Sequence, residues 1–106
     1  MRKITPIIFI SFLISGKLYS QAIYKSLGGS WNSALSWTLD SGIDGDADGK
    51  PDSNDEVIIE GNTINLDINV SCEKLTINAL GILNFNTNSR TLTVNTDLTL
   101  NDDATM

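Results

Sequence analysis

Apolar and polar residues alternate along the second half of the chain with the two-residue period of β-strands. Between residues 63 and 70, aliphatic residues alternate with Thr, Asn and Asp, which is typical of a strand with one buried face. Shorter runs of the same kind occur at residues 57–59, 75–77, 83–85, 92–94 and 98–100. No stretch after residue 22 has a helical period with caps, so the pattern predicts an all-β chain.

A short sequence motif repeats within these predicted strands. Leu-Thr-aliphatic-Asn occurs at Leu75–Asn78, Leu92–Asn95 and Leu98–Asn101. The segment KLTINALGIL (74–83) aligns with DLTLNDDATM (97–106), which places Leu75 on Leu98. Repeats of about 20–50 residues are typical of solenoids and propellers. We therefore predict a right-handed parallel β-helix, a solenoid in which the last two copies are faces of one coil, joined by a bend at Thr96-Asp97.

The abundance of asparagine fits this prediction but does not decide it. Asn is frequent throughout 23–106, often at the ends of predicted strands. Asn tolerates the left-handed backbone of tight bends and can form hydrogen-bonded ladders between stacked strands. A β-sandwich also uses Asn in its turns, and it remains the alternative fold.

Residues 1–22 have the features of a secretory signal peptide. Arg2 and Lys3 precede an apolar run at 4–15, and small residues at Ser20 and Ala22 stand at −3 and −1 of a cleavage site. The apolar run of about 12 residues is too short to cross a bilayer as a helix. We expect a secreted or cell-surface protein with no membrane span after cleavage. Cleavage after Ser20 is the alternative bond.

Removal of this segment makes the chain strongly acidic. The formal net charge of the whole sequence is −6, but residues 23–106 hold four basic and 13 acidic residues, which gives −9. Such a surface repels nucleic acid and anionic lipid, whose binding requires Lys and Arg. The composition therefore excludes nucleic acid as a partner.

The remaining chain divides into three predicted parts. Residues 23–43 would cap the N-terminal end of the β-helix, residues 44–55 form a loop rich in aspartate, and residues 56–106 form the coils. The repeat stops at Met106 without a polar cap, which solenoids need. We expect an incomplete set of coils, and self-association through the uncapped C-terminal end.

The acidic loop, residues 44–55, has the ligand spacing of a calcium loop. Its sequence is DGDADGKPDSND, with Gly49 at the sharp-turn position 6. No helical pattern flanks the loop, so an extracellular calcium loop without helices fits better than an EF-hand. A solvated acidic connector is the alternative. The candidate ligands of a structural Ca²⁺ are Asp44, Asp46, Asp48, the Lys50 carbonyl, Asp52 and Asp55.

Catalysis is the least supported class of function. The chain has no His, which excludes His-dependent triads and His-ligated zinc. Cys72 is the only cysteine and is expected to be buried as a small apolar residue. Trp31 and Trp37 could present rings to a sugar, but covering the open end of the core is the preferred interpretation. No residue is assigned a catalytic role.

One run of the sequence resembles a known family. The stretch from Trp31 to Phe85, including DEVIIEGNTINLD and CEKLTINALGILNF, resembles the G8-type segment and its bacterial relatives at the N-terminal end of β-helical surface proteins. The matching positions are Trp31, Trp37, Pro51, Asp55, Val57, Ile59, Gly61, Leu66, Asp67, Leu75, Ile77, Gly81, Leu83 and Phe85. The resemblance implies an extracellular recognition or adhesion module.

We therefore expect a non-catalytic binding or structural module of a surface protein, acting in adhesion or glycan contact. Its partners would be an extracellular glycan or a surface protein. The alternative is the non-catalytic N-terminal portion of a secreted polysaccharide-processing enzyme.

Overall fold

The computed structural model describes residues 21–85 and 89–106, and this part of the chain consists mainly of strands and turns. Its elements in chain order are β1 (Ala22–Ser26), β2 (Gly29–Ser30), the 3-10 helix η1 (Ala34–Ser36), β3 (Trp37–Gly42), β4 (Glu56–Ile59), β5 (Thr63–Asn65), β6 (Val70–Ile77), β7 (Ile82–Asn84) and β8 (Leu92–Leu100). The predicted signal peptide lies outside the described residues, except for Gln21 and Ala22.

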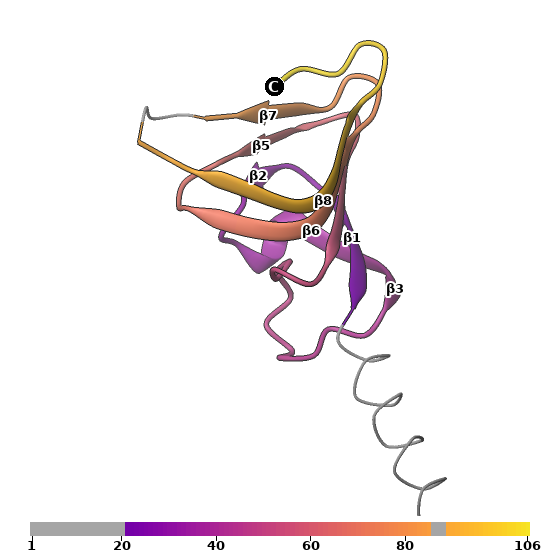
Figure 1. Cartoon of the computed structure of the whole chain (residues 1–106), viewed down its shortest axis with the longest axis vertical. Coiled ribbons are helices and arrows are strands. Elements are labelled where there is room, and N and C mark those ends of the chain that lie inside the picture. The colour runs from indigo at the N-terminus through magenta and orange to yellow at the C-terminus, as the bar shows by residue number, and fades with distance from the viewer. Residues whose placement is uncertain (1–20, 86–88) are drawn as a thin grey trace, which may run out of the picture.

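The described strands form two separate sheets that face each other across the core (Figure 1). One sheet has five strands in the order β3-β1-β4-β6-β8, and the other has three in the order β2-β5-β7. Neighbouring strands are parallel, except that β1 and β3 are antiparallel. The larger sheet is therefore mixed, and neither sheet closes on itself.

The predicted right-handed parallel β-helix with an N-terminal cap is wrong. The described chain forms two open sheets of unequal size, and β3 turns back beside β1 in antiparallel pairing. The β-sandwich alternative is not observed either, because such sandwiches pair antiparallel sheets and most of these strand pairs are parallel. The sequence repeat led to the wrong fold because it specifies only which strands pair in parallel. Parallel strands can pair in this way within open sheets, without coiling into a β-helix.

The pairing of β6 with β8 shows what the repeat does specify. Leu75 pairs with Leu98 and Ile77 pairs with Leu100, as in the alignment of the two repeated segments. The second and third copies of the motif lie in the continuous strand β8, except for Asn101, so the Thr96-Asp97 step does not separate two strands. A register irregularity between Cys72 and Lys74 absorbs the extra residue of β8.

The core lies between the two sheets. Alternate residues of β4 and β6 point inward, so that Val57, Ile59, Leu75 and Ile77 are completely buried. They share one apolar cluster with residues of the facing sheet, represented by Ile64. Burial of this apolar surface is the main force that holds the sheets together.

Asparagine side chains link neighbouring strands at the ends of both sheets. Asn84 donates from Nδ2 to Asn65 Oδ1 at 3.1 Å, and Asn101 donates to Asn78 Oδ1 at 2.6 Å. Asn78 in turn donates to Glu60 Oε1 at 3.1 Å. These side-chain hydrogen bonds explain part of the high asparagine content, because each one joins the ends of two neighbouring strands.

The sheet edge at β8 leaves the end of the core partly exposed. Leu98, Leu100 and Met106 are each close to half exposed. Within the described chain, β8 is an edge strand of the larger sheet and β7 is an edge strand of the smaller one. The edge of β7 is covered only by a single β-bridge between Ile82 and Thr105. Unpaired strand edges can pair with another chain. Self-association through this end stays a prediction.

The alternation of burial along the chain makes the two faces of a strand differ in their tolerance of substitution. Ile77→Val removes a methyl group from the core, and we expect a loss of about 0.5–1.5 kcal/mol in the free energy of unfolding. Ile82→Val makes the same change at a side chain that is 37% exposed and should cost clearly less. Urea denaturation of both variants measures the difference. Equal losses would contradict the described burial.

Candidate metal centre

The acidic loop connects β3 to β4 and is folded by its own aspartate side chains. Asp44 Oδ2 accepts the Gly49 N–H at 2.7 Å, and Asp48 Oδ1 accepts the Lys50 N–H at 2.9 Å. Asp46 Oδ1 accepts the Asp48 N–H at 3.3 Å. Short aspartate side chains bond readily to backbone N–H groups a few residues ahead, which is why DxDxDG sequences form tight turns.

The backbone of the loop needs a left-handed residue at the position where the sequence has glycine. Gly49 has a φ of 75°. A Cβ at this position would also lie 3.1 Å from the Ala34 Cβ. The sharp turn predicted at position 6 of the loop is therefore present, and Gly is the residue that forms it with least strain.

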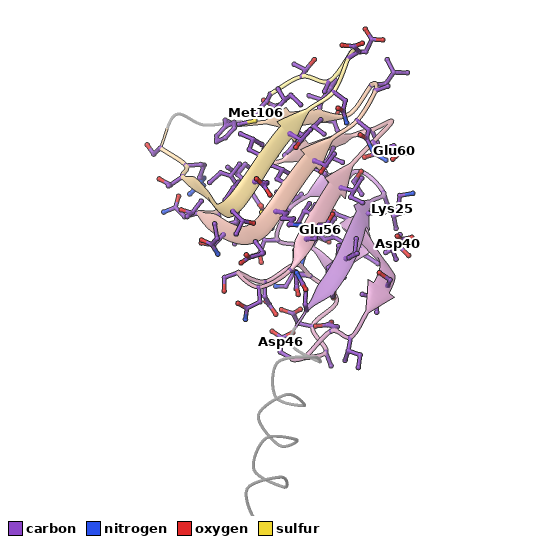
Figure 2. The ribbon with its side chains drawn as sticks, turned by 45° about the vertical axis from the view of Figure 1, so that its right-hand side comes forward. Lys25, Asp40, Asp46, Glu56, Glu60 and Met106 are labelled. Atoms are coloured by element: carbon purple, nitrogen blue, oxygen red, sulfur yellow. The ribbon has the colours of Figure 1, made fainter. Side chains whose placement is uncertain are left out.

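The carboxylates of four aspartates of the loop lie close together. One carboxylate oxygen from each of Asp44, Asp46, Asp48 and Asp52 lies within 4.8 Å of the other three. Figure 2 shows Asp46 at the end of the molecule opposite Met106, away from the open edge of the sheets. These four aspartates, here called the carboxylate cluster, could hold a metal ion.

The other two predicted ligands have different surroundings. Asp55 is buried, and its carboxylate accepts the Ala22 N–H at 2.9 Å and the Asp52 N–H at 2.8 Å. The Lys50 ammonium donates to Asn32 Oδ1 at 2.9 Å, and ligation by the Lys50 carbonyl stays a prediction. Asp55 therefore fastens the loop to β1 and is not part of the carboxylate cluster.

Further hydrogen bonds attach the end of the loop to the larger sheet. The Asp55 carbonyl accepts the Glu73 N–H of β6 at 2.7 Å. The Ser53 carbonyl accepts Nδ2 of Asn95, a residue of β8, at 3.0 Å. The loop is thus held by β1, β6 and β8, and the position of Asp52 is fixed by this framework.

Tyr24 is a residue of the site that the sequence interpretation missed. Its side chain is 1% exposed, and its hydroxyl has no hydrogen-bond partner. This hydroxyl faces the Asp44 carboxylate, whose Oδ1 is also buried without a partner. Burial, followed by the interaction of the hydroxyl with the Asp44 side chain and by the negative charge of Asp44, raises the pKa of Tyr24. The only sequence signal was the inward position of Tyr24 in a strand, which does not indicate a partner in the loop.

Crowding of the carboxylates changes their proton affinities. Burial, followed by the charges of Asp46 and Asp48, raises the pKa of Asp52 to about 6. The neighbouring Asp44 carboxylate raises the pKa of Asp46. Although burial opposes its ionisation, the Gly49 N–H and other donors hold the pKa of Asp44 below its ordinary value. Asp46 and Asp52 therefore keep their protons to a higher pH than isolated carboxyl groups, and a cation would compensate the negative charge of the cluster.

The two tryptophans lie in the core. Trp31 is 2% exposed and Trp37 is 5% exposed, and their rings meet edge to face with centroids 5.1 Å apart. Trp37 Nε1 donates to the Trp31 carbonyl at 2.8 Å. This burial agrees with a packing role for both rings.

Cys72 is also buried, as expected. Burial raises the pKa of its thiol to about 12. A thiol that stays protonated is a poor nucleophile and a poor metal ligand, so Cys72 contributes packing.

Comparisons with known proteins identify no relative. No family model, no curated protein and no solved structure matches this chain. The resemblance to G8-type segments therefore stays an expectation that rests on the residues. In the described part of the chain, no helix has the length and apolar character that a membrane span requires.

The raised pKa of Asp52 predicts how stability depends on pH without metal. Its folded-state pKa lies above the ordinary value of 3.8, so the folded state binds this proton more tightly than the unfolded state. In chelator, we expect the melting temperature to fall as pH rises from about 4 to about 6. Asp52→Asn should weaken this dependence, and Asp102→Asn, at an exposed acid outside the loop, should leave it unchanged. A melting temperature that rises over this interval would contradict the prediction.

The two hydrogen bonds to Asp55 predict a structural role for this residue. Asp55→Ala leaves the Ala22 and Asp52 N–H groups without their acceptor, and we expect it to cost about 1–3 kcal/mol of unfolding free energy. Asp97→Ala, at an exposed carboxylate of β8, is the matched control and should cost much less. Denaturant titration measures both. A neutral Asp55 substitution would contradict the proposed tie to β1.

Proposed function

We propose that this chain is an exported, non-catalytic binding or structural module whose acidic loop holds one structural Ca²⁺ ion. The observation that carries the proposal is the carboxylate cluster, backed by the buried and unpaired Tyr24 hydroxyl. A cation bound to the cluster would neutralise much of its charge. It would also ligate the unpaired Asp44 oxygen that faces this hydroxyl.

The donor set supports calcium over other common metals. All four side chains offer carboxylate oxygens, whereas zinc prefers Cys and His, and the sequence has no His. Ca²⁺ takes six to eight oxygen ligands in flexible geometry, which suits a loop of this kind. Mg²⁺ requires a near-ideal octahedron and keeps several of its waters, so it gains less from four crowded carboxylates.

The proposed role of the ion is to stabilise the loop. Asp55 already fastens the end of the acidic loop to β1, and its Asp44 end faces β1 through Tyr24. An ion shared by Asp44, Asp46, Asp48 and Asp52 would join both parts of the loop. Binding to the folded state alone raises stability by an amount set by the ion concentration relative to its Kd.

Export would expose the acidic loop to the high calcium concentrations outside cells. Extracellular calcium modules have Kd values of about 10⁻⁴–10⁻³ M, which match calcium concentrations outside cells. The structure favours cleavage after Ser20 over cleavage after Ala22, because Ala22 is the buried first residue of β1. Adhesion or glycan contact is the action that we propose for the exported module.

Thermal unfolding with and without calcium tests the proposal. At about ten times the Kd, calcium should add roughly 1.4 kcal/mol, or about 5–10 °C in melting temperature for a domain of this size. Asp48→Asn should abolish most of this shift, because it removes a ligand charge. Asp102→Asn changes the net charge equally outside the loop and should keep the shift. Circular dichroism in calcium and in chelator measures all three proteins. An identical melting temperature of the unsubstituted protein in both buffers would sink the proposal.

A further inference from the structure

A pocket of about 240 Å³ lies directly beside the carboxylate cluster. Asp48 and Asp52 belong to both the cluster and the pocket wall. Asp48 is exposed, so the pocket opens to solvent on the side where the cluster is accessible. Pockets for drug-sized ligands occupy roughly 300–1,000 Å³, so this one fits a smaller unit, such as a single sugar ring.

The cluster itself leaves room for an outside ligand. If each carboxylate gives one oxygen, the four aspartates fill four of the six to eight oxygen positions of Ca²⁺. Tyr24 indicates that the Asp44 side of the cluster belongs to a ligand site, because its side chain is 1% exposed and its unpaired hydroxyl is turned toward Asp44. Asp48 and Asp52 line the pocket, whereas Asp44 and Asp46 do not. Coordination positions on the pocket side are open to water or to a ligand oxygen.

The remaining walls of the pocket combine polar and apolar groups. The polar residues are Asn32, Ser53, Asn69 and Ser71, whose amide and hydroxyl groups can bond to hydroxyls of a ligand. Pro51, Ile68 and Val70 provide apolar surface. A sugar ring presents both kinds of surface, since its hydroxyls lie at the rim and its C–H groups on the faces.

The charge of the pocket selects against an anion. The four aspartates outnumber the charges of one Ca²⁺ and Lys50, and Asp55 lies close behind them. Lys50 is held by Asn32 Oδ1, so its ammonium is already partly compensated. The net negative charge of the pocket would therefore repel a ligand carboxylate, whereas it would not repel a neutral pair of hydroxyls.

We infer that the Ca²⁺ ion held by the carboxylate cluster binds a neutral saccharide in this pocket, through two adjacent hydroxyl groups of one sugar ring. The two hydroxyl oxygens occupy coordination positions beside Asp48 and Asp52. The pocket residues bond to the rest of the ring. This inference rests on the proposed calcium site and adds the class of ligand to it.

Isothermal titration calorimetry of the purified protein tests the inference in two steps. Calcium alone is titrated first, and then methyl α-D-mannopyranoside and methyl β-D-galactopyranoside are titrated in calcium and in chelator. The two glycosides together present cis and trans pairs of adjacent hydroxyls. We expect at least one to bind with a Kd in the millimolar range in calcium, and about tenfold or more weakly in chelator. Methyl α-D-glucuronide, which carries a carboxylate, should bind more weakly than that glycoside.

A substitution in the pocket separates the saccharide from the ion. Ser53→Phe fills the pocket from an exposed position and leaves all four aspartates in place, so it should abolish glycoside binding and keep calcium binding. Ser41→Phe makes the same change at an exposed residue of β3 outside the pocket and should keep both.

Each outcome decides between the two proposals. Calcium binding without binding of either glycoside overturns the saccharide inference and leaves the calcium proposal standing. Glycoside binding that is equal in chelator, or unchanged in Ser53→Phe, also overturns the inference. Absence of calcium binding overturns both.

Discussion

The mutual repulsion of four carboxylates at one end of the molecule is the constraint that governs the acidic loop and its surroundings. In an unconstrained loop, these carboxylates would move apart and be solvated by water. Here Asp44, Asp46, Asp48 and Asp52 stay within 4.8 Å of one another, because the loop is folded by backbone bonds and fastened to the sheet. Protons relieve the electrostatic cost of this arrangement at low pH, and a bound cation would relieve it at neutral pH.

The fold maintains that arrangement through a small number of buried contacts. Asp55 bonds to β1, its carbonyl accepts from β6, and Tyr24 supports Asp44 from the core. Val57 pairs with Tyr24 on one side and with Leu75 on the other, which keeps β1, β4 and β6 in register, so these anchors lie on neighbouring inner strands of the larger sheet. The same framework places the pocket next to the cluster, so the proposed ion would lie beside the proposed saccharide site.

The sequence predicted local features better than their arrangement. Period-two alternation located β4, β6, β7 and β8, because side chains of a strand alternate between the core and the surface. The predicted strand at 63–70 is instead β5 followed by the start of β6, and the strands β1, β2 and β3 were not predicted. The alignment of the repeated segments identified the pairing of Leu75 with Leu98. The β-helix was wrong because pairing in parallel is encoded locally, whereas the antiparallel return of β3 depends on contacts between Ile23 and Ser41 that no sequence period shows.

The candidate site shows the same division. Aspartate spacing predicted the four residues that converge, since hydrogen bonds within DxDxDG are local. It could not separate them from Asp55, whose carboxylate is taken by Ala22, a residue 33 positions earlier in the chain. Tyr24 was missed for the same reason, because its relation to Asp44 exists only after β1 is placed beneath the loop.

The most direct test of the calcium site is the stoichiometry of calcium binding, measured by calorimetry on the purified protein at pH 7. We expect one Ca²⁺ per chain with a Kd of about 10⁻⁴–10⁻³ M. Absence of saturable binding at millimolar calcium would contradict the site, and the acidic loop would then be a charged connector held together by its own hydrogen bonds.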